Sequence, residues 1–250
     1  MAPNFRLDGK QALVTGAGRG LGKGIAQALA AFGAKVTLLS RTQKEIKDVA
    51  KTIIASGGKA DILQMDANDL EAVSQAVEER GPFNILVNNA GMNIPASTLD
   101  VSVEDFDAIM SLNVKAAYFL SQAVGKGLVA AQQAGSIINI SSQMGHVGSA
   151  RRSVYCASKH AMEGFTKAMA IEWGQYNIRV NTVCPTFIET PLTKPFLEDK
   201  DFKSKVLKMI HAGRIGQVDD VTGAVVFLAS DASSLITGTA LKVDGGWTAE

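Results

Sequence analysis

Several features that point to particular classes of protein are scarce or missing in this sequence. It has only two cysteines, Cys156 and Cys184, which form neither a metal-ligand spacing nor a disulfide framework. The 25 lysines and arginines nearly balance the 24 aspartates and glutamates, without the basic excess of a nucleic-acid-binding protein or the polybasic run of a membrane-surface protein. Neither an apolar leader nor an apolar run of membrane-spanning length is present. We therefore expect a reduced, cytoplasmic protein without a metal and without nucleic acid or membrane as a partner.

The chain also has no internal repeat, no low-complexity stretch and no interdomain linker. Short β-branched runs alternate with longer helical runs, which is typical of parallel βαβ units in a doubly wound sheet. We predict an α/β fold with one domain over residues 1–250. The expected strands are Gln11–Thr15, Lys35–Ser40, Lys59–Met65, Phe83–Asn88, Ser136–Ser141, Ile178–Val183 and Ala240–Val243. The expected helices are Gly22–Phe32, Lys44–Ser56, Leu70–Arg80, Val103–Val124, Val154–Trp173 and Val218–Ala229.

One segment, residues 184–214, interrupts this alternation. It contains Pro185, Pro191 and Pro195 and a charged stretch over residues 198–201. A connection of this length between a strand and the next helix is uncommon, and it often forms a lid or a binding loop. We expect it to be a substrate lid, with a mobile surface loop as the alternative.

The turn after the first predicted strand is rich in glycine. It reads Thr15-Gly16-Ala17-Gly18-Arg19-Gly20-Leu21-Gly22, which departs from G-x-G-x-x-G because Leu21 stands where the third glycine is expected. Glycines here permit positive φ and bring backbone amides at a helix N-terminus close to a pyrophosphate. The position at the first strand-to-helix junction favours nucleotide binding over a plain tight turn.

A tyrosine and a lysine four residues apart, Tyr155 and Lys159, lie in an apolar helical run. Residues at this spacing share a helix face, so the ammonium is able to lie beside the phenol. The pKa of a free phenol is about 10, and a neighbouring positive charge lowers it. Ser142, after a predicted strand, is placed to hold a substrate oxygen against the tyrosine. The spacing alone also fits an ordinary surface pair, so other motifs have to decide.

Taken in order, the motifs resemble the short-chain dehydrogenase/reductase family in its compact single-domain form. The resemblance implies a Rossmann-like, doubly wound parallel seven-stranded sheet with helices on both faces. One departure is Thr186, which follows Pro185 where many members have glycine. The matching elements, between about residues 7 and 247, are Thr15-Gly16-x-x-x-Gly20-x-Gly22, Asn88-Asn89-Ala90-Gly91, Asn113, Ser142, Tyr155-x-x-x-Lys159, Asn181-x-Val183-x-Pro185 and Val243-Asp244-Gly245-Gly246.

By this resemblance the protein transfers a hydride between a nicotinamide cofactor and a secondary alcohol or ketone. Tyr155 is the expected general acid or base, Lys159 lowers its pKa and binds the nicotinamide ribose, and Ser142 steadies the substrate oxygen. Asn113 is expected to hold a proton-relaying water, with a purely structural role as the alternative. The residues implied to bind the cofactor are Gly16, Gly18, Arg19, Gly20, Leu21, Ser40, Arg41, Asp66, Ala67, Asn89, Ala90, Gly91, Tyr155, Lys159, Ile188 and Thr190.

The end of the second predicted strand bears on the choice of cofactor. A carboxylate there would bind the ribose hydroxyls of NAD, whereas an arginine suits the 2′-phosphate of NADP. The sequence has Ser40 followed by Arg41 at this point, and Arg19 in the glycine turn is a second candidate. We therefore expect NADP(H) to be favoured over NAD(H).

The expected substrate is a small molecule such as a polyol, a sugar acid or a hydroxy acid. Arg152 stands three residues before Tyr155, and the resemblance extends to 3-hydroxybutyrate dehydrogenases, which have a basic residue there. A guanidinium at this place suits a carboxylate, although a solvated loop arginine is the plain alternative. The residues expected to touch the substrate are Ser142, Gln143, His146, Arg152 and Tyr155.

Two other functions fit the same residues. One is a 3-oxoacyl-[acyl-carrier-protein] reductase, which performs the same reaction on a carrier-bound thioester. The other is a non-catalytic nucleotide-sensing or scaffold protein, which has no need of intact Ser142, Tyr155 and Lys159. The resemblance also implies a homotetramer that assembles through the helices Val103–Val124 and Val154–Trp173 and the last strand.

Overall fold

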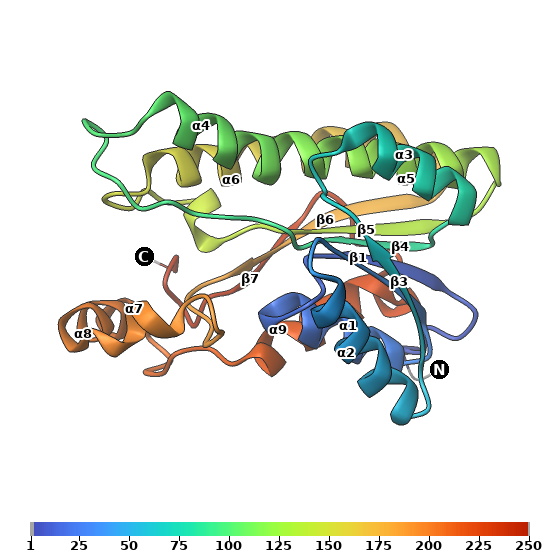
Figure 1. Cartoon of the computed structure of the whole chain (residues 1–250), viewed down its shortest axis with the longest axis horizontal. Coiled ribbons are helices and arrows are strands. Elements are labelled where there is room, and N and C mark those ends of the chain that lie inside the picture. Colours follow the sequence, from blue (N-terminus) through green and yellow to red (C-terminus); the bar gives the residue numbers. More distant parts are fainter. Residues whose placement is uncertain (1–2, 250) are drawn as a thin grey trace.

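A parallel sheet forms the centre of the molecule, as the computed structural model shows for residues 3–249 (Figure 1). Its strands follow the order β3-β2-β1-β4-β5-β6-β7, and every neighbouring pair is parallel. The order reverses between β1 and β4, which is where ligands bind in sheets of this kind. The strands are β1 (Gln11–Thr15), β2 (Lys35–Ser40), β3 (Lys59–Gln64), β4 (Ile85–Asn88), β5 (Gly135–Ile140), β6 (Ile178–Pro185) and β7 (Ala240–Val243).

Helices cover both faces of the sheet, so the predicted doubly wound, Rossmann-like α/β fold is confirmed (Figure 1). One face carries α1 (Gly20–Ala31), α2 (Gln43–Ala55) and α9 (Val218–Ala229). The other face carries α3 (Leu70–Arg80), α5 (Ala117–Ala130) and α6 (Ser153–Trp173). Within residues 3–249, no helix combines the length and the apolar character that crossing a bilayer requires.

Alternation along the strands builds two hydrophobic cores, one on each face. In β1, Val14 faces the core under α1 and α9, and Leu13 faces the core under α3 and α5. The register places Val87 and Leu86 of β4 beside them, so the two layers continue across the sheet. Because both faces are covered, these strands read as continuous apolar runs.

Several predicted strands and helices begin or end one or two residues from their observed bounds, and two predicted elements differ in kind. The helix predicted over Val103–Val124 is divided into α4 (Val103–Met110), a π-helical turn η1 (Ser111–Ala116) and α5. Apolar periodicity runs through all three, so the change of winding leaves no clear mark in the sequence.

The segment over residues 184–214 contains more structure than a loop. It forms α7 (Lys194–Glu198) and α8 (Lys200–Met209). Pro195 lies in the first turn of α7, where a backbone N–H has no helical partner to lose, and Asp199 caps α8. Pro195, one of the prolines that interrupt the sequence pattern, therefore lies at the start of a helix. Figure 1 shows α7 and α8 beside the C-terminal segment, away from the main helical layers.

Candidate active site

A cavity of about 390 Å³ opens at the carboxyl ends of β1, β4, β5 and β6. Every residue predicted to bind the cofactor lines it, as does Ser142. Sequence reasoning missed several other residues that line the cavity. Most of them stand next to a predicted residue in the chain, and that adjacency could have indicated them. The missed lining residues are Gly22, Leu39, Thr42, Glu45, Met65, Asn68, Met92, Asn93, Leu112, Ile140, Ser141, Pro185, Thr186, Pro191, Leu192 and Thr193.

The glycine turn closes one end of this cavity. Gly16 and Gly20 adopt φ of 63° and 54°, a region in which a side chain would be strained. A Cβ added at Gly22 would lie 2.3 Å from the Gly16 carbonyl oxygen, so helix α1 packs directly on the turn. The turn thus exposes backbone to the cavity, as a pyrophosphate site requires.

Thr15 and Asn89 join this turn to the end of β4. The Thr15 hydroxyl accepts hydrogen bonds from the amides of Asn89 (3.0 Å) and Ala90 (2.9 Å). The Asn89 side chain donates in return to the carbonyl oxygens of Thr15 (2.9 Å) and Gly16 (3.3 Å). Two segments more than 70 residues apart are therefore held as one frame. The sequence shows Thr15 in its motif, but spacing alone does not reveal this cross-link.

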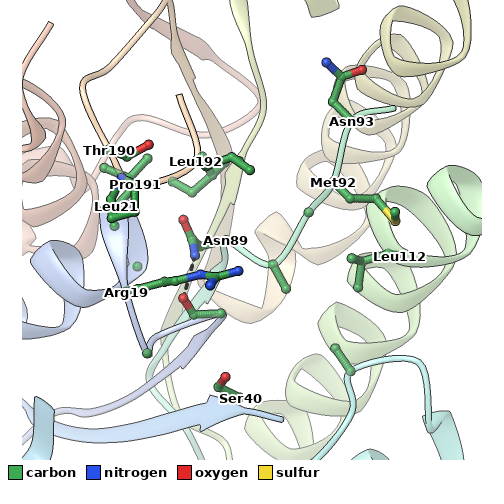
Figure 2. Close-up of a pocket in the computed structure, with 18 of the residues that line it drawn as sticks. Arg19, Leu21, Ser40, Asn89, Met92, Asn93, Leu112, Thr190, Pro191 and Leu192 are labelled. Carbon is green, nitrogen blue, oxygen red and sulfur yellow. Dashed lines mark hydrogen bonds between the residues drawn. The ribbon is translucent and has the colours of Figure 1, made fainter. Parts of the chain in front are cut away.

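The end of β2 supplies the charged rim of the cavity. Arg41 is exposed, and its guanidinium lies 3.8 Å from Asp66 Oδ2. Arg19 is also exposed and lies 3.7 Å from Glu45 Oε1. Figure 2 shows Arg19 near Ser40 on one side of the cavity, with Met92 and Leu112 on the other. Both ion pairs are long and solvent-exposed, so both arginines are able to turn to a phosphate at little cost.

Tyr155 and Ser142 face each other at the inner end of the cavity. Burial raises the pKa of the Tyr155 phenol, while a hydrogen bond with Ser142 and the positive charge of Arg152 lower it. Ser142 Oγ also donates to Gln143 Oε1 (2.8 Å) and accepts from the Met144 amide (3.1 Å). The Ser142 hydroxyl is thus fixed beside the phenol. Lowering of the tyrosine pKa by Lys159 stays a prediction, and Arg152 is a cation that the sequence reasoning did not give this role.

Lys159 is buried beneath Tyr155. Its Nζ lies 5.6 Å from the centre of the tyrosine ring and donates to the Ile140 carbonyl oxygen (2.8 Å). Burial lowers the pKa of Lys159 from 10.5 to about 8, against the opposing charges of Cys184 and Glu163. The ammonium therefore titrates near the pH range in which an enzyme works.

Asn113 is fully buried in the π-helical turn, and its side chain holds the segment that follows β4. Its Oδ1 accepts from the Met92 amide (2.8 Å), and its Nδ2 donates to the Met92 carbonyl (2.9 Å) and to Ser158 Oγ (3.1 Å). These bonds tie η1, the cavity wall and α6 together. The predicted water relay stays a prediction, and the side chain itself fixes the cavity wall.

Of the residues predicted to touch the substrate, Ser142 and Tyr155 line this cavity, whereas Gln143, His146 and Arg152 are not part of its lining. Arg152 has aromatic surroundings. The Arg152 guanidinium lies 5.6 Å from the centre of the Phe187 ring, and Phe187 packs against Phe202 (5.5 Å) and Trp247 (5.9 Å). Sequence reasoning missed these three aromatics, which stand far apart in the chain and meet only through the fold. The His146 side chain contacts Cys184 instead, with its Nε2 3.5 Å from Cys184 Sγ.

Comparisons with known proteins place this arrangement in a family. A family model described as Enoyl-(Acyl carrier protein) reductase matches residues 16–248. The L-xylulose reductase of Bos taurus is 39% identical over 246 residues, which cover 98% of this chain and 99% of that protein. This chain belongs to the short-chain dehydrogenase/reductase family.

Two further similar proteins bear on the activity of this short-chain dehydrogenase/reductase. The gluconate 5-dehydrogenase of Gluconobacter oxydans is 38% identical over 98% of this chain and 96% of that protein. The structure of a gluconate 5-dehydrogenase from Burkholderia cenocepacia in complex with NADP and tartrate has 36% identity and a TM-score of 0.95, covering 99% of this chain and 98% of that one. The protein is an NAD(P)-dependent oxidoreductase that acts on a secondary alcohol or the corresponding ketone. The relatives are named for sugars and sugar acids, so the 3-oxoacyl thioester reductase and the non-catalytic sensor are not favoured.

The residues of this short-chain dehydrogenase/reductase fit a dinucleotide. The positive-φ glycines leave backbone room that a Cβ would fill, and the cavity runs from the charged rim at Arg41 to Tyr155. Two buried polar atoms in its lining, Asn93 Oδ1 and Thr186 Oγ1, have no hydrogen-bond partner within the described residues 3–249. Buried polar groups are nearly always paired, so these two atoms mark places for a polar ligand. Thr186 is the residue that departs from the family's usual glycine.

Proposed function

We propose that this enzyme is an NADP(H)-preferring dehydrogenase whose substrate is a hydroxy acid or a sugar acid. The observation that carries this proposal is the position of Arg152, a half-buried guanidinium beside Tyr155 and over the Phe187 ring. The substrate carboxylate binds Arg152, and the oxygen on the reacting carbon contacts Tyr155.

The surroundings of Arg152 favour a carboxylate over a neutral polyol. Burial lowers the pKa of its guanidinium, and the groups whose charges oppose this are Tyr155 and Cys156 rather than a carboxylate. A partly desolvated cation of this kind is stabilised by an anionic partner, and guanidinium binds carboxylates with two parallel hydrogen bonds. The aromatic face of Phe187 holds the guanidinium in place through a cation–π contact.

The similar proteins support this substrate class. Two of them are gluconate 5-dehydrogenases, and one of those structures contains tartrate, which carries two carboxylates beside two hydroxyl groups. The L-xylulose reductase represents the neutral alternative within the same family. Arg152 is the residue of this chain that favours an acidic substrate over a neutral polyol, because its guanidinium binds a carboxylate.

In the mechanism, Tyr155 gives a proton to the carbonyl oxygen during reduction and removes it from the hydroxyl during oxidation. The Ser142 hydroxyl orients the same oxygen by a hydrogen bond, and its own position is held by Gln143 and the Met144 amide. When bound, a nicotinamide cofactor would supply or accept the hydride at the reacting carbon. A pKa raised by burial keeps the phenol protonated until the oxygen needs the proton.

Lys159 and Asn113 support this proton transfer. The Lys159 ammonium lies under the tyrosine ring and favours the phenolate that forms when the proton leaves. Asn113 keeps the cavity wall at Met92 in place through its hydrogen bonds. This fixes one side of the proposed proton path beside Lys159. Proton supply through a water held near Asn113 belongs to this proposal.

Preference for NADP(H) rests on Arg41 and Arg19. Both guanidinium groups stand at the rim beside the end of β2, and their carboxylate partners lie 3.7 to 3.8 Å away in exposed pairs. A 2′-phosphate offers each arginine a stronger, charge-assisted contact than these pairs do. We expect Arg41→Ala to raise KM for NADP about 10–100-fold and to leave KM for NAD within about 3-fold. Lys44→Ala, an exposed cation on the same side that pairs with Asp48, is the matched control.

The substrate class is tested by steady-state kinetics of Arg152→Gln with gluconate, a 2-hydroxy acid and xylitol. Loss of the guanidinium is expected to lower kcat/KM about 10–100-fold for the acid that is turned over, because a charged hydrogen bond contributes about 1.5–3 kcal/mol. The xylitol rate is expected to fall less than the rate with the acid, because a neutral substrate is affected only by the loss of the Arg152 charge near Tyr155. Arg151→Gln, at the exposed neighbouring position, is the control. Wild-type preference for xylitol over every acid, or equal loss on all substrates, contradicts the proposal.

Assembly and the role of residues 184–214 complete the proposal. Val103, Phe106 and Phe119 on α4 and α5 are exposed apolar side chains, which suits helices that pair in a homotetramer. Light scattering of the purified chain measures this state.

Helices α7 and α8 form the substrate lid, in which Phe202 contacts Phe187. The free cysteines, Cys156 and Cys184, are consistent with the cytoplasmic location that we propose.

A further inference from the structure

Three side chains that could not be paired from sequence spacing meet behind the catalytic residues. His146 follows the short helical turn η2 (Gln143–Gly145), Glu163 lies on α6 one turn after Lys159, and Cys184 is the last residue but one of β6. Their ligand atoms all lie within 4.8 Å of one another. The mechanism uses none of the three.

The distances within this cluster match a metal coordination sphere. His146 Nε2 lies 3.5 Å from Cys184 Sγ and 3.7 Å from Glu163 Oε1, and Cys184 Sγ lies 3.3 Å from Glu163 Oε1. Tetrahedral zinc has metal–ligand distances of about 2.0–2.3 Å, which separates such ligand atoms by about 3.4–3.6 Å. The three atoms thus have the mutual spacing of one face of a zinc tetrahedron.

Charge and ligand type agree with the geometry. Glu163 and Cys184 are both buried. Zn²⁺ bound to a carboxylate, a thiolate and a neutral imidazole is a net neutral unit, which suits a buried site. As the sulfur–zinc bond forms, the S–H bond breaks and its proton passes to solvent; nothing is oxidised or reduced.

Two further observations favour a bound ion. The Ser141 hydroxyl, 4% exposed, has no hydrogen-bond partner among residues 3–249. It lies on the Glu163 side of the cluster, because a Cβ added at Gly145 would be 3.0 Å from Ser141 Oγ and 3.2 Å from Glu163 Cγ. Thr182 Oγ1 donates to Glu163 Oε2 (2.9 Å), the type of outer hydrogen bond that orients a carboxylate ligand. The His146 side chain is 22% exposed and provides an entry path.

We propose that His146, Glu163 and Cys184 form a zinc site, with Ser141 Oγ or a water as the fourth ligand. The ion ties together the loop after Ser142, helix α6 with Tyr155 and Lys159, and the end of β6. The site is structural, because the metal lies behind the reacting atoms.

The test is zinc binding to the metal-stripped full chain, measured by competition with a chromophoric chelator. Wild type is expected to bind one Zn²⁺ per chain. Cys184→Ser and His146→Asn are expected to weaken binding about 100-fold or more, beyond the loss that outer-sphere substitutions cause. Cys156→Ser, which removes the other free cysteine, is expected to bind as wild type does.

Cobalt provides a second measurement that does not depend on any variant folding. Co²⁺ added to the stripped wild type is expected to give a thiolate-to-cobalt charge-transfer band and the visible bands of tetrahedral cobalt. Zinc is expected to raise the Tm of wild type but not that of His146→Asn. Absence of stoichiometric zinc, a cobalt spectrum without the thiolate band, or equal affinity in Cys184→Ser overturns the proposal.

Discussion

The two ends of the active site differ in how much backbone and how much side chain they contain. At the nucleotide end the glycine turn and the amides after β4, joined by the Thr15–Asn89 hydrogen bonds, bring backbone to the cavity. Arginine side chains are added only at the exposed rim of this end. The end that we propose for the substrate consists of long side chains, Arg152, Phe187 and Trp247, from three separate segments.

The nucleotide end therefore determines which reaction the enzyme performs, and the substrate end determines which molecule it acts on. Backbone positions are set by the fold, so a change there disturbs cofactor binding for every substrate alike. Side chains at the other end are replaceable without moving the sheet, which lets one fold serve many substrates. Tyr155 and Lys159 lie between the two ends and serve both. Predictions that separate the ends follow in order of expected effect.

The largest effect is expected at Tyr155, where the two ends meet. Tyr155→Phe removes the proton donor and should lower kcat about 10²–10⁴-fold with every substrate, because general acid catalysis contributes that much. Cofactor affinity, measured by fluorescence titration, should stay within about 3-fold of wild type. Tyr176→Phe, at an exposed tyrosine, is the control. A variant that retains turnover would remove Tyr155 from the reaction.

A smaller effect is expected at the nucleotide end from Gly22→Ala. The added Cβ would lie 2.3 Å from the Gly16 carbonyl oxygen, so the turn has to shift. Overpacking of this kind costs about 1–3 kcal/mol, which predicts a rise of about 5–150-fold in the cofactor KM. The change should be the same for acidic and neutral substrates. Gly127→Ala on α5 is the control, because no atom lies within 4 Å of its added Cβ. A substrate-dependent result would break the separation of the two ends.

The same division decides how much the sequence could predict. Strand boundaries, the glycine turn and the residues lining the nucleotide end follow local patterns, and the structure brings them together in one cavity. The cluster of Phe187, Phe202 and Trp247 depends on how α8 and the C-terminal segment fold back, and no periodicity encodes that. His146, Glu163 and Cys184 meet for the same reason, since spacing along the chain does not show them as neighbours.

Lys159 offers a pH measurement at the boundary between the ends. Burial lowers its pKa from 10.5 to about 8, so between these values the unfolded chain keeps a proton that the folded chain has lost. The free energy of unfolding of wild type should therefore rise with pH above about 8, relative to Lys159→Met, by at most about 1.4 kcal/mol per pH unit. Urea denaturation from about pH 7 to 10 in chelator-containing buffer measures this. A difference between the two proteins that stays flat or falls contradicts burial of the ammonium.

The smallest effect is expected from Phe187→Leu at the substrate end. Leucine keeps an apolar contact with Phe202 and Trp247 but loses the aromatic face under the Arg152 guanidinium. A partly exposed cation–π contact contributes about 0.5–1 kcal/mol, so KM for the acidic substrate should rise about 2–5-fold. Cofactor KM and the rate with a neutral alcohol should not change. Phe196→Leu, on exposed α7, is the matched control. If Phe187→Leu instead raises the cofactor KM, the aromatic cluster supports the nucleotide end as well, and substrate choice and cofactor binding are coupled through the lid.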